Sequence, residues 1–331
     1  MAALDFMKLL TEERRKAKAR QSNGRSAGNV QGASSSSSSS SIIITTTVGS
    51  PAPRTNCAHS AVDMSFRQLH EEDHRCATKG SLQNVWYMGD FCTKQQSKWM
   101  LDCIFDDANA ACWVQLKRRR LQCWGGEPPG FGDKLPSFRP EPLPEWAVLI
   151  AESLVGAGIF QKGQTPNHLL VNAYERGEGI LPHTDGPFYF PRTATLSLSL
   201  DDGPHVDRNN AQEGALMIFS PRLKTHEIGA AGRSRELSGE FVLRNRSILV
   251  FDSSAYLDHT HAIEERATDV ASEKLLNGSA SESQPNQTIL RPKTRVSLTF
   301  RYIPTGAGPC CNRKYTKEAG SKGDDTTPDT N

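Results

Sequence analysis

The sequence has no long apolar run, which excludes a membrane span formed by a helix. Such a span needs roughly 20 apolar residues, whereas the longest candidate, residues 147–160, is interrupted by Glu152, Ser153 and glycines. The first residues also lack the apolar centre of a secretory signal peptide. We therefore expect no membrane among the partners of this protein.

The sequence also lacks closely spaced cysteine pairs and an excess of charge of one sign. The eight cysteines form no C-x-x-C pair, so neither a zinc ribbon nor a disulfide scaffold is expected, and the thiols are predicted to stay reduced. The 39 Lys and Arg nearly balance the 37 Asp and Glu, which excludes a wholly basic nucleic-acid coat but allows a local basic groove. We expect an intracellular protein of the nucleus and cytoplasm.

Hydrophobic residues make up only 37% of the 331 residues, which is low for a chain folded from end to end. Residues 1–83 are predicted to be a short helix followed by a disordered Ser-rich linker. Residues 1–20 carry apolar positions and a basic cluster, which suits a protein partner or nuclear import, although a frayed terminus explains them equally well. One folded domain is expected over 84–304, with a disordered polar insert at 268–293 and a disordered tail at 305–331. We expect a monomer.

The folded part is predicted to be mainly β. Period-two alternation of apolar and polar residues recurs in short segments, which is typical of a jelly roll, also called a double-stranded β-helix. Flanking helices are expected near 94–108 and 145–160. The predicted strands are 85–91, 168–175, 193–200, 215–219, 240–252 and 294–303.

One motif formally predicts a zinc peptidase. His70 to His74 reads H-E-x-x-H, a pattern that binds zinc when it lies on a buried helix. The segment is charged all round and lies beside the Ser-rich linker. A solvated helix or loop is therefore the favoured interpretation.

Two H-x-D pairs offer ligands for another metal. His205 and Asp207 lie in a polar, turn-rich stretch, whereas His183 and Asp185 lie between strand-like segments. Residues i and i+2 of a strand point to one face, so the second pair can bind one ion together. A distant histidine, His259 or His261, would complete the two-His-one-carboxylate set of non-haem Fe(II) oxygenases, and spacing alone does not choose between them.

The last strand places two arginines on one polar face. Arg295 and Arg301 are six residues apart and alternate with apolar residues. Buried guanidiniums are costly unless an anion neutralises them, so a dicarboxylate such as 2-oxoglutarate fits, with surface salt bridges as the alternative. Asn172 and Tyr174 likewise share one face of an earlier strand.

In their order and local context, these motifs resemble the AlkB family of Fe(II)- and 2-oxoglutarate-dependent dioxygenases. Three longer stretches, LKRRRLQCWGG, NHLLVNAYERGEGILPHTDGPFYFP and TRVSLTFRYIP, are also similar to that family. The resemblance covers roughly residues 84–304. It implies that His183, Asp185 and His261 hold iron, because Tyr256 and His261 reproduce the Tyr-x4-His spacing of the family.

The resemblance also implies a cosubstrate pocket and a loop-rich substrate lid. Arg295 would bind the distal carboxylate of 2-oxoglutarate, and the pocket would be completed by Arg301, Asn172 and Tyr174. The stretch from Val114 to Phe138 would be part of the lid. In it, Arg118, Arg119 and Arg120 would contact phosphates, and Trp113 or Trp124 would stack on a base; a solvated loop is the alternative for the arginine run.

The activity implied is O2-dependent demethylation of N-methyl groups on nucleic acid, with release of succinate, CO2 and formaldehyde. The methylated base would have to be single-stranded or flipped out of a duplex. Two alternatives remain open at this point: an oxygenase that acts on protein, and a catalytically silent binding protein on the same fold. The sequence does not distinguish RNA, DNA and protein as substrates.

Overall fold

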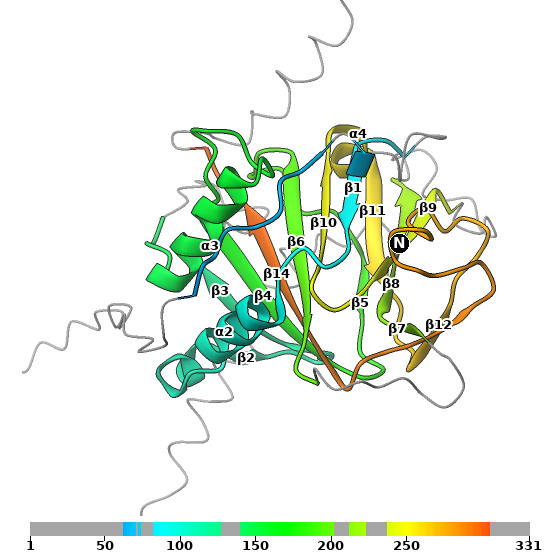
Figure 1. Ribbon diagram of the computed structural model, residues 1–331, viewed down its shortest axis with the longest axis horizontal. Coiled ribbons are helices and arrows are strands. Elements are labelled where there is room, and N and C mark those ends of the chain that lie inside the picture. The colour runs from blue at the N-terminus through cyan, green and yellow to red at the C-terminus, as the bar shows by residue number, and fades with distance from the viewer. Residues whose placement is uncertain are drawn as a thin grey trace, which may run out of the picture.

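The computed structural model describes residues 62–70, 72–73, 82–126, 140–201, 212–222 and 237–304. In this part of the chain, two antiparallel sheets pack face to face, and helices cover the outer face of the larger sheet (Figure 1). This arrangement confirms the predicted jelly roll. No helix among the described residues is long and apolar enough to cross a membrane.

The larger sheet contains seven strands of the described chain in the order β1-β10-β6-β14-β4-β3-β2. The long strands β4, β6 and β14 lie at its centre and run antiparallel to one another. Its strands are β1 (Val85–Met88), β2 (Val114–Gln115), β3 (Arg120–Trp124), β4 (His168–Glu175), β6 (Arg192–Ser199), β10 (Ser247–Asp252) and β14 (Thr294–Arg301).

The smaller sheet has the order β5-β11-β8-β9, and a third sheet has the order β12-β13-β7. The smaller sheet consists of β5 (Ile180–His183), β8 (Ala215–Pro221), β9 (Gly239–Leu243) and β11 (His259–Ile263). The third consists of β7 (Gln212–Glu213), β12 (Thr268–Val270) and β13 (Thr288–Leu290).

The two faces of the larger sheet differ in chemistry. On β14, Val296, Leu298 and Phe300 point outward into an apolar core. The polar residues that alternate with them point inward, toward the smaller sheet. The central strands therefore present an unusually polar surface inside the barrel, and this surface carries the candidate site.

The outer apolar face is covered by helices α2 (Lys94–Ile104) and α3 (Glu145–Gly156). Helix α2 begins at a capping box, in which Thr93 and Gln96 each bond the backbone of the other. A 3₁₀ helix, Asp107–Cys112, follows α2, and the short helix α4 (Ser253–Leu257) precedes β11. The two flanking helices were predicted from sequence and are confirmed.

The prediction that the polar insert 268–293 is disordered was wrong. The insert contributes β12 and β13, and its buried residues carry specific hydrogen bonds. Asn277 bonds both the backbone N–H and the carbonyl of Val242, as a neighbouring strand would. Arg291 forms a buried ion pair with Asp269. A polar composition therefore did not mean disorder here, because the polar side chains satisfy buried backbone groups.

Two predicted boundaries were also wrong. The folded part begins before residue 84, because Met64 and Phe66 are buried against the outer core and the Phe66 ring lies 4.7 Å from that of Phe91. The predicted strand 240–252 is two strands, since the chain turns at Arg246 with φ of 62°. Residues 1–20, most of the linker and the tail from 305 lie outside the described residues.

Candidate metal and cosubstrate site

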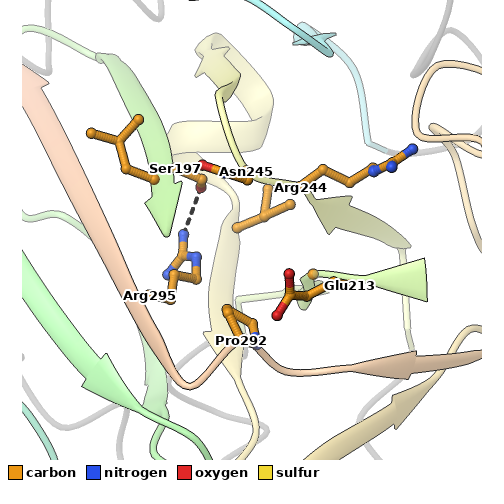
Figure 2. A pocket seen from close by; sticks show the side chains of 9 residues that line it. Ser197, Glu213, Arg244, Asn245, Pro292 and Arg295 are labelled. Carbon is orange, nitrogen blue, oxygen red and sulfur yellow. Dashed lines mark hydrogen bonds between the residues drawn. The ribbon is translucent and has the colours of Figure 1, made fainter. Parts of the chain in front are cut away.

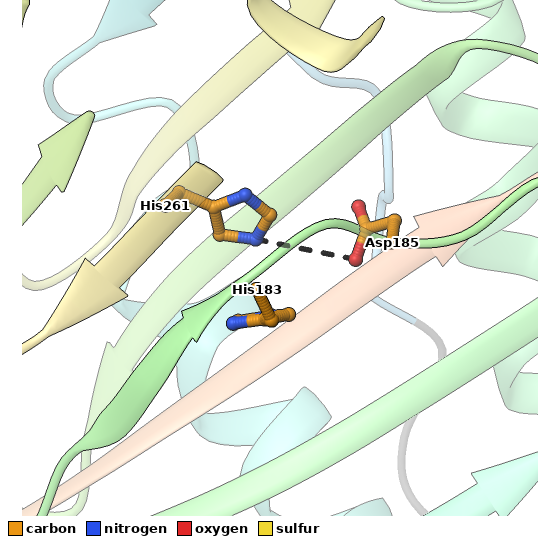
Figure 3. Close-up of side chains that lie close together, drawn as sticks. All are labelled: His183, Asp185 and His261. Carbon is orange, nitrogen blue, oxygen red and sulfur yellow. Dashed lines mark ion pairs between the residues drawn. The ribbon is translucent and has the colours of Figure 1, made fainter. Parts of the chain in front are cut away.

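Three buried side chains meet between the two sheets. His183 ends β5, Asp185 follows two residues later, and His261 lies in β11 directly across from His183 in the strand register. One ligand atom from each lies within 4.8 Å of the others, and His261 Nε2 is 4.0 Å from Asp185 Oδ1 (Figure 3). The structure thus brings together the three residues that the sequence predicts as a metal site.

Asp185 is held by two donors from the larger sheet. The Arg301 guanidinium donates to Oδ1 at 2.5 Å, and Thr193 Oγ1 donates to Oδ2 at 2.7 Å. Burial raises the pKa of the Asp185 carboxyl, but Arg301, both histidines and Thr193 outweigh burial and hold this pKa below its ordinary value. The carboxylate is therefore charged and oriented, as a metal ligand requires.

Both imidazoles of the cluster are neutral at physiological pH. Burial lowers the pKa of His183 well below its ordinary value, and the neighbouring His261 lowers it further. Burial likewise lowers the pKa of His261. His183 Nδ1 lies 2.8 Å from the carbonyl oxygen of Leu181, which fixes the tautomer and leaves Nε2 as the ligand atom.

The geometry also distinguishes the two candidates for the distal histidine. His259 lies two residues earlier on the same strand and pairs with Pro221, whereas His261 pairs with His183. His259 Nδ1 is 3.0 Å from the carbonyl of Ser254. His261 is thus the histidine that joins the cluster, although the role of the cluster as an iron site stays a prediction at this point.

Arg295 lies on the same polar face as Arg301, at the opposite end of β14, and is only 5% exposed. It donates to Ser197 Oγ at 2.8 Å beside a small pocket that is also lined by Glu213, Asn245 and Pro292 (Figure 2). Its Nε has no hydrogen-bond partner among the described residues. Burial lowers the pKa of Arg295 to about 10, against the opposing effect of Tyr174, so the guanidinium remains charged at neutral pH.

Asn172 and Tyr174 lie on β4, on the same inward face as Arg295 of the neighbouring strand β14. The Arg295 guanidinium carbon is 5.6 Å from the centre of the Tyr174 ring. Asn172 pairs with Ser297 across β4 and β14, and its Oδ1 accepts a hydrogen bond from Arg119 Nε at 3.0 Å. All the predicted pocket residues therefore share one interior surface.

Comparison with known proteins identifies the family, although no family model matches the chain. The chain is 32% identical over 220 residues to a Danio rerio protein named "Probable RNA/DNA demethylase ALKBH6", covering 66% of this chain and 86% of that protein. The chain belongs to the AlkB family of Fe(II)- and 2-oxoglutarate-dependent dioxygenases.

Two other similarities are weaker. The chain is 25% identical over 238 residues to the Xenopus tropicalis "tRNA (carboxymethyluridine(34)-5-O)-methyltransferase alkbh8", over 69% of this chain but only 34% of that protein. A solved 2OG-Fe(II) oxygenase of Burkholderia pseudomallei is 13% identical with a TM-score of 0.33, covering 66% of this chain and 84% of the other.

Part of the predicted lid lies in a hairpin at the edge of the larger sheet. Strands β2 and β3 form the two arms of this hairpin, and residues 116–119, which include Arg118 and Arg119, form the turn between them. Arg118 forms an ion pair with Glu265, and Arg120 lies over the rings of Phe105 and Trp113. Lid residues 127–138 lie outside the described residues.

Trp124 points away from the metal cluster. On β3, residues 120, 122 and 124 face the helices, since a strand alternates its side chains. Trp124 packs edge-on against Trp146 of α3, with ring centres 6.1 Å apart, and Trp113 stacks on Phe105. Both tryptophans are partly buried against the outer core, and stacking of either on a substrate base stays a prediction.

The competing metal motifs gain no support. Of the H-E-x-x-H motif, Glu71 and His74 lie outside the described residues, and Asp73 accepts hydrogen bonds from the His70 backbone and from Arg67. His205 and Asp207 also lie outside the described residues.

Sequence reasoning missed Thr193 and Ser197. Both belong to the TATLSLSL segment, where the alternation was used only to predict a strand. The missed signal is that both faces of a central strand are buried, so its polar face must line a site or a hydrogen-bonded interior.

Proposed function

We propose that this protein is an Fe(II)- and 2-oxoglutarate-dependent dioxygenase that removes N-methyl groups from nucleic acid. The observation that carries the proposal is the buried cluster of His183, Asp185 and His261 on the same interior surface as a buried guanidinium. Two imidazoles and one carboxylate are the ligands that such oxygenases use for Fe(II).

The residues present fit both groups. The cluster offers neutral imidazoles and a charged carboxylate, which is the ligand state that binds a divalent metal. Arg295 has a buried Nε without a partner among the described residues. A carboxylate would accept a hydrogen bond from this Nε and would also neutralise the charge of the guanidinium. A dicarboxylate that reaches from Arg295 toward the cluster suits this surface.

In this proposal, His183, Asp185 and His261 hold Fe(II), and Arg295 binds the distal carboxylate of 2-oxoglutarate. Tyr174 and Asn172 border the cosubstrate, while Arg301 and Thr193 keep Asp185 ionised and oriented. When bound, the iron supplies the oxidation of 2-oxoglutarate by O2 that is coupled to hydroxylation of a C–H bond. The protein itself fixes the ligands, neutralises the dianion and excludes water.

Nucleic acid is proposed as the substrate because relatives of the chain are named as an RNA/DNA demethylase and as a tRNA methyltransferase. A methyl group on a base nitrogen would leave as formaldehyde after hydroxylation, with succinate and CO2 as coproducts. The base would need to be unpaired or flipped to reach a buried metal cluster. We further propose that the protein acts as a monomer in the nucleus and cytoplasm.

The proposal is tested with the full chain, reconstituted anaerobically with Fe(II) and then exposed to air with 2-oxoglutarate. Methylated RNA, DNA and peptide panels are supplied separately, and succinate and formaldehyde are measured for each. Formaldehyde from a nucleic-acid panel supports the proposal. Formaldehyde from peptides alone would replace nucleic acid by protein as the substrate, and no succinate from any panel would favour a silent binding protein.

A further inference from the structure

Arg119 differs from its two neighbours in the arginine run. Arg118 and Arg120 pair with surface or outer-core groups, whereas Arg119 is 7% exposed and points into the barrel. Its carbonyl accepts from the Leu116 N–H and closes the turn between β2 and β3. Its Nε donates to Asn172 Oδ1 at 3.0 Å, so it reaches an interior residue 53 positions away in the sequence.

This hydrogen bond fixes the orientation of the Asn172 amide. A guanidinium nitrogen can only donate, so the amide atom that faces Arg119 must be the oxygen. The Asn172 NH2 group is therefore the end of the amide that is turned away from Arg119. Two N–H donors on the interior surface of the barrel suit an anionic oxygen.

The position of Asn172 relative to Arg295 matches the length of a dicarboxylate. Asn172 lies two residues before Tyr174, which pairs directly with Arg295, and two residues of a strand span about 7 Å. Asn172 therefore lies on the same inward face as Arg295, and Arg119 reaches this face through its hydrogen bond to Asn172.

We propose that Arg119 is a positioning residue for the cosubstrate: its hydrogen bond to the Asn172 oxygen holds the Asn172 NH2 group toward the 2-oxoglutarate site on this inward face. The inference rests on the proposed function, since it presumes that 2-oxoglutarate occupies this surface. An arginine of the edge hairpin that the sequence analysis assigns to nucleic-acid contacts would thus orient a residue of the cosubstrate pocket instead.

The test is the dissociation constant of 2-oxoglutarate, measured by calorimetry on the full chain loaded with Mn(II), which requires no turnover. Arg119→Met is expected to raise the dissociation constant about tenfold, which corresponds to a loss of about 1.4 kcal/mol of binding free energy. Asn172→Ala is expected to raise it similarly, and the double variant no more than the worse single one, because the two residues act as a unit. If the double variant raised the dissociation constant by the product of the two single effects, the residues would act independently and the proposal would be overturned.

Asn172→Asp keeps the shape of the side chain and the partner of Arg119, so it guards against misfolding. It replaces the NH2 group by a carboxylate oxygen, and it should weaken 2-oxoglutarate binding at least as much as Asn172→Ala. Wild-type affinity in this variant would contradict the proposed amide orientation. Arg67→Met, which removes a half-exposed guanidinium paired with Asp73, is the matched control and should bind normally.

The two possible failures are distinguishable. If the wild-type Mn(II) protein does not bind 2-oxoglutarate, the proposed function fails and the inference fails with it. If the wild type binds and Arg119→Met binds equally well, only the role of Arg119 fails.

Discussion

Replacing Thr193 by valine removes one hydrogen bond to Asp185 and changes little else. Thr193 is buried, and its Oγ1 donates to Asp185 Oδ2 at 2.7 Å. Valine has nearly the same shape, so the substitution opens no cavity. The carboxylate keeps its bond to Arg301 but loses the donor that orients its other oxygen.

The expected size of the effect follows from the burial of this bond. A hydrogen bond to a charged group contributes about 1.5–3 kcal/mol, so the metal-free variant should be less stable by about that free energy of unfolding. For a domain of this size, each kcal/mol lowers Tm by roughly 2–4 °C. Partners that orient a metal ligand typically affect metal affinity about 10–100-fold, so Mn(II) should bind that much more weakly.

Calorimetric titration with Mn(II) and thermal unfolding of the metal-free chain measure both effects. Thr195→Val is the matched control, since Thr195 lies two residues later on the same face and contacts Thr299 at 3.4 Å instead of a carboxylate. It should leave Mn(II) affinity unchanged. Equal Mn(II) affinity in wild type and Thr193→Val would refute the reasoning that Asp185 must be oriented by its donors.

Three further predictions concern the distal histidine, pH and the insert. His261→Ala should abolish Mn(II) binding in a calorimetric titration, whereas His259→Ala should retain it; the opposite pattern would exchange the two roles. Because burial lowers the pKa of His183 and His261, the unfolded chain takes up protons below about pH 6.5 that the folded chain does not. The metal-free protein should therefore lose up to about 2.7 kcal/mol of stability per pH unit as the pH falls below 6.5, and a flat Tm between pH 7 and 5 would contradict this. Asn277→Ala leaves the Val242 N–H and carbonyl without their partner, at about 1–3 kcal/mol for each group, and an unchanged denaturation midpoint would show that the insert does not stabilise the barrel.

The central strands and the metal ligands could be predicted because their signals are local. Alternation in β6 and β14 identifies strands, and two residues of spacing place His183 and Asp185 together. Spacing alone left His259 and His261 open, because both lie two residues apart on one strand, and only the family resemblance favoured His261. In the structure, pairing with β5 brings His261 to His183, and such a contact between segments far apart in the sequence could not be derived from local spacing.

Two of these differences share a physical cause, which is that a polar side chain looks the same in the sequence whether it meets water or a buried partner. Arg119 was assigned to a lid that contacts phosphates, yet it bonds Asn172 inside the barrel. Asn277 was assigned to a disordered insert, yet it is buried and pairs with Val242. The contact of Trp124 with Trp146 could not be predicted for a different reason, because the sequence does not reveal which face of an edge strand the helices cover.

The most direct test of the account is succinate formation by the Fe(II)-reconstituted full chain in the presence of 2-oxoglutarate and O2. The wild-type protein should form succinate, Asp185→Ala should form none, and Asp207→Ala, in the other H-x-D motif, should be unaffected. Absence of Fe(II)-dependent succinate from the wild type, with or without a methylated substrate, would contradict the assignment of His183, Asp185 and His261 as the iron site of a working oxygenase.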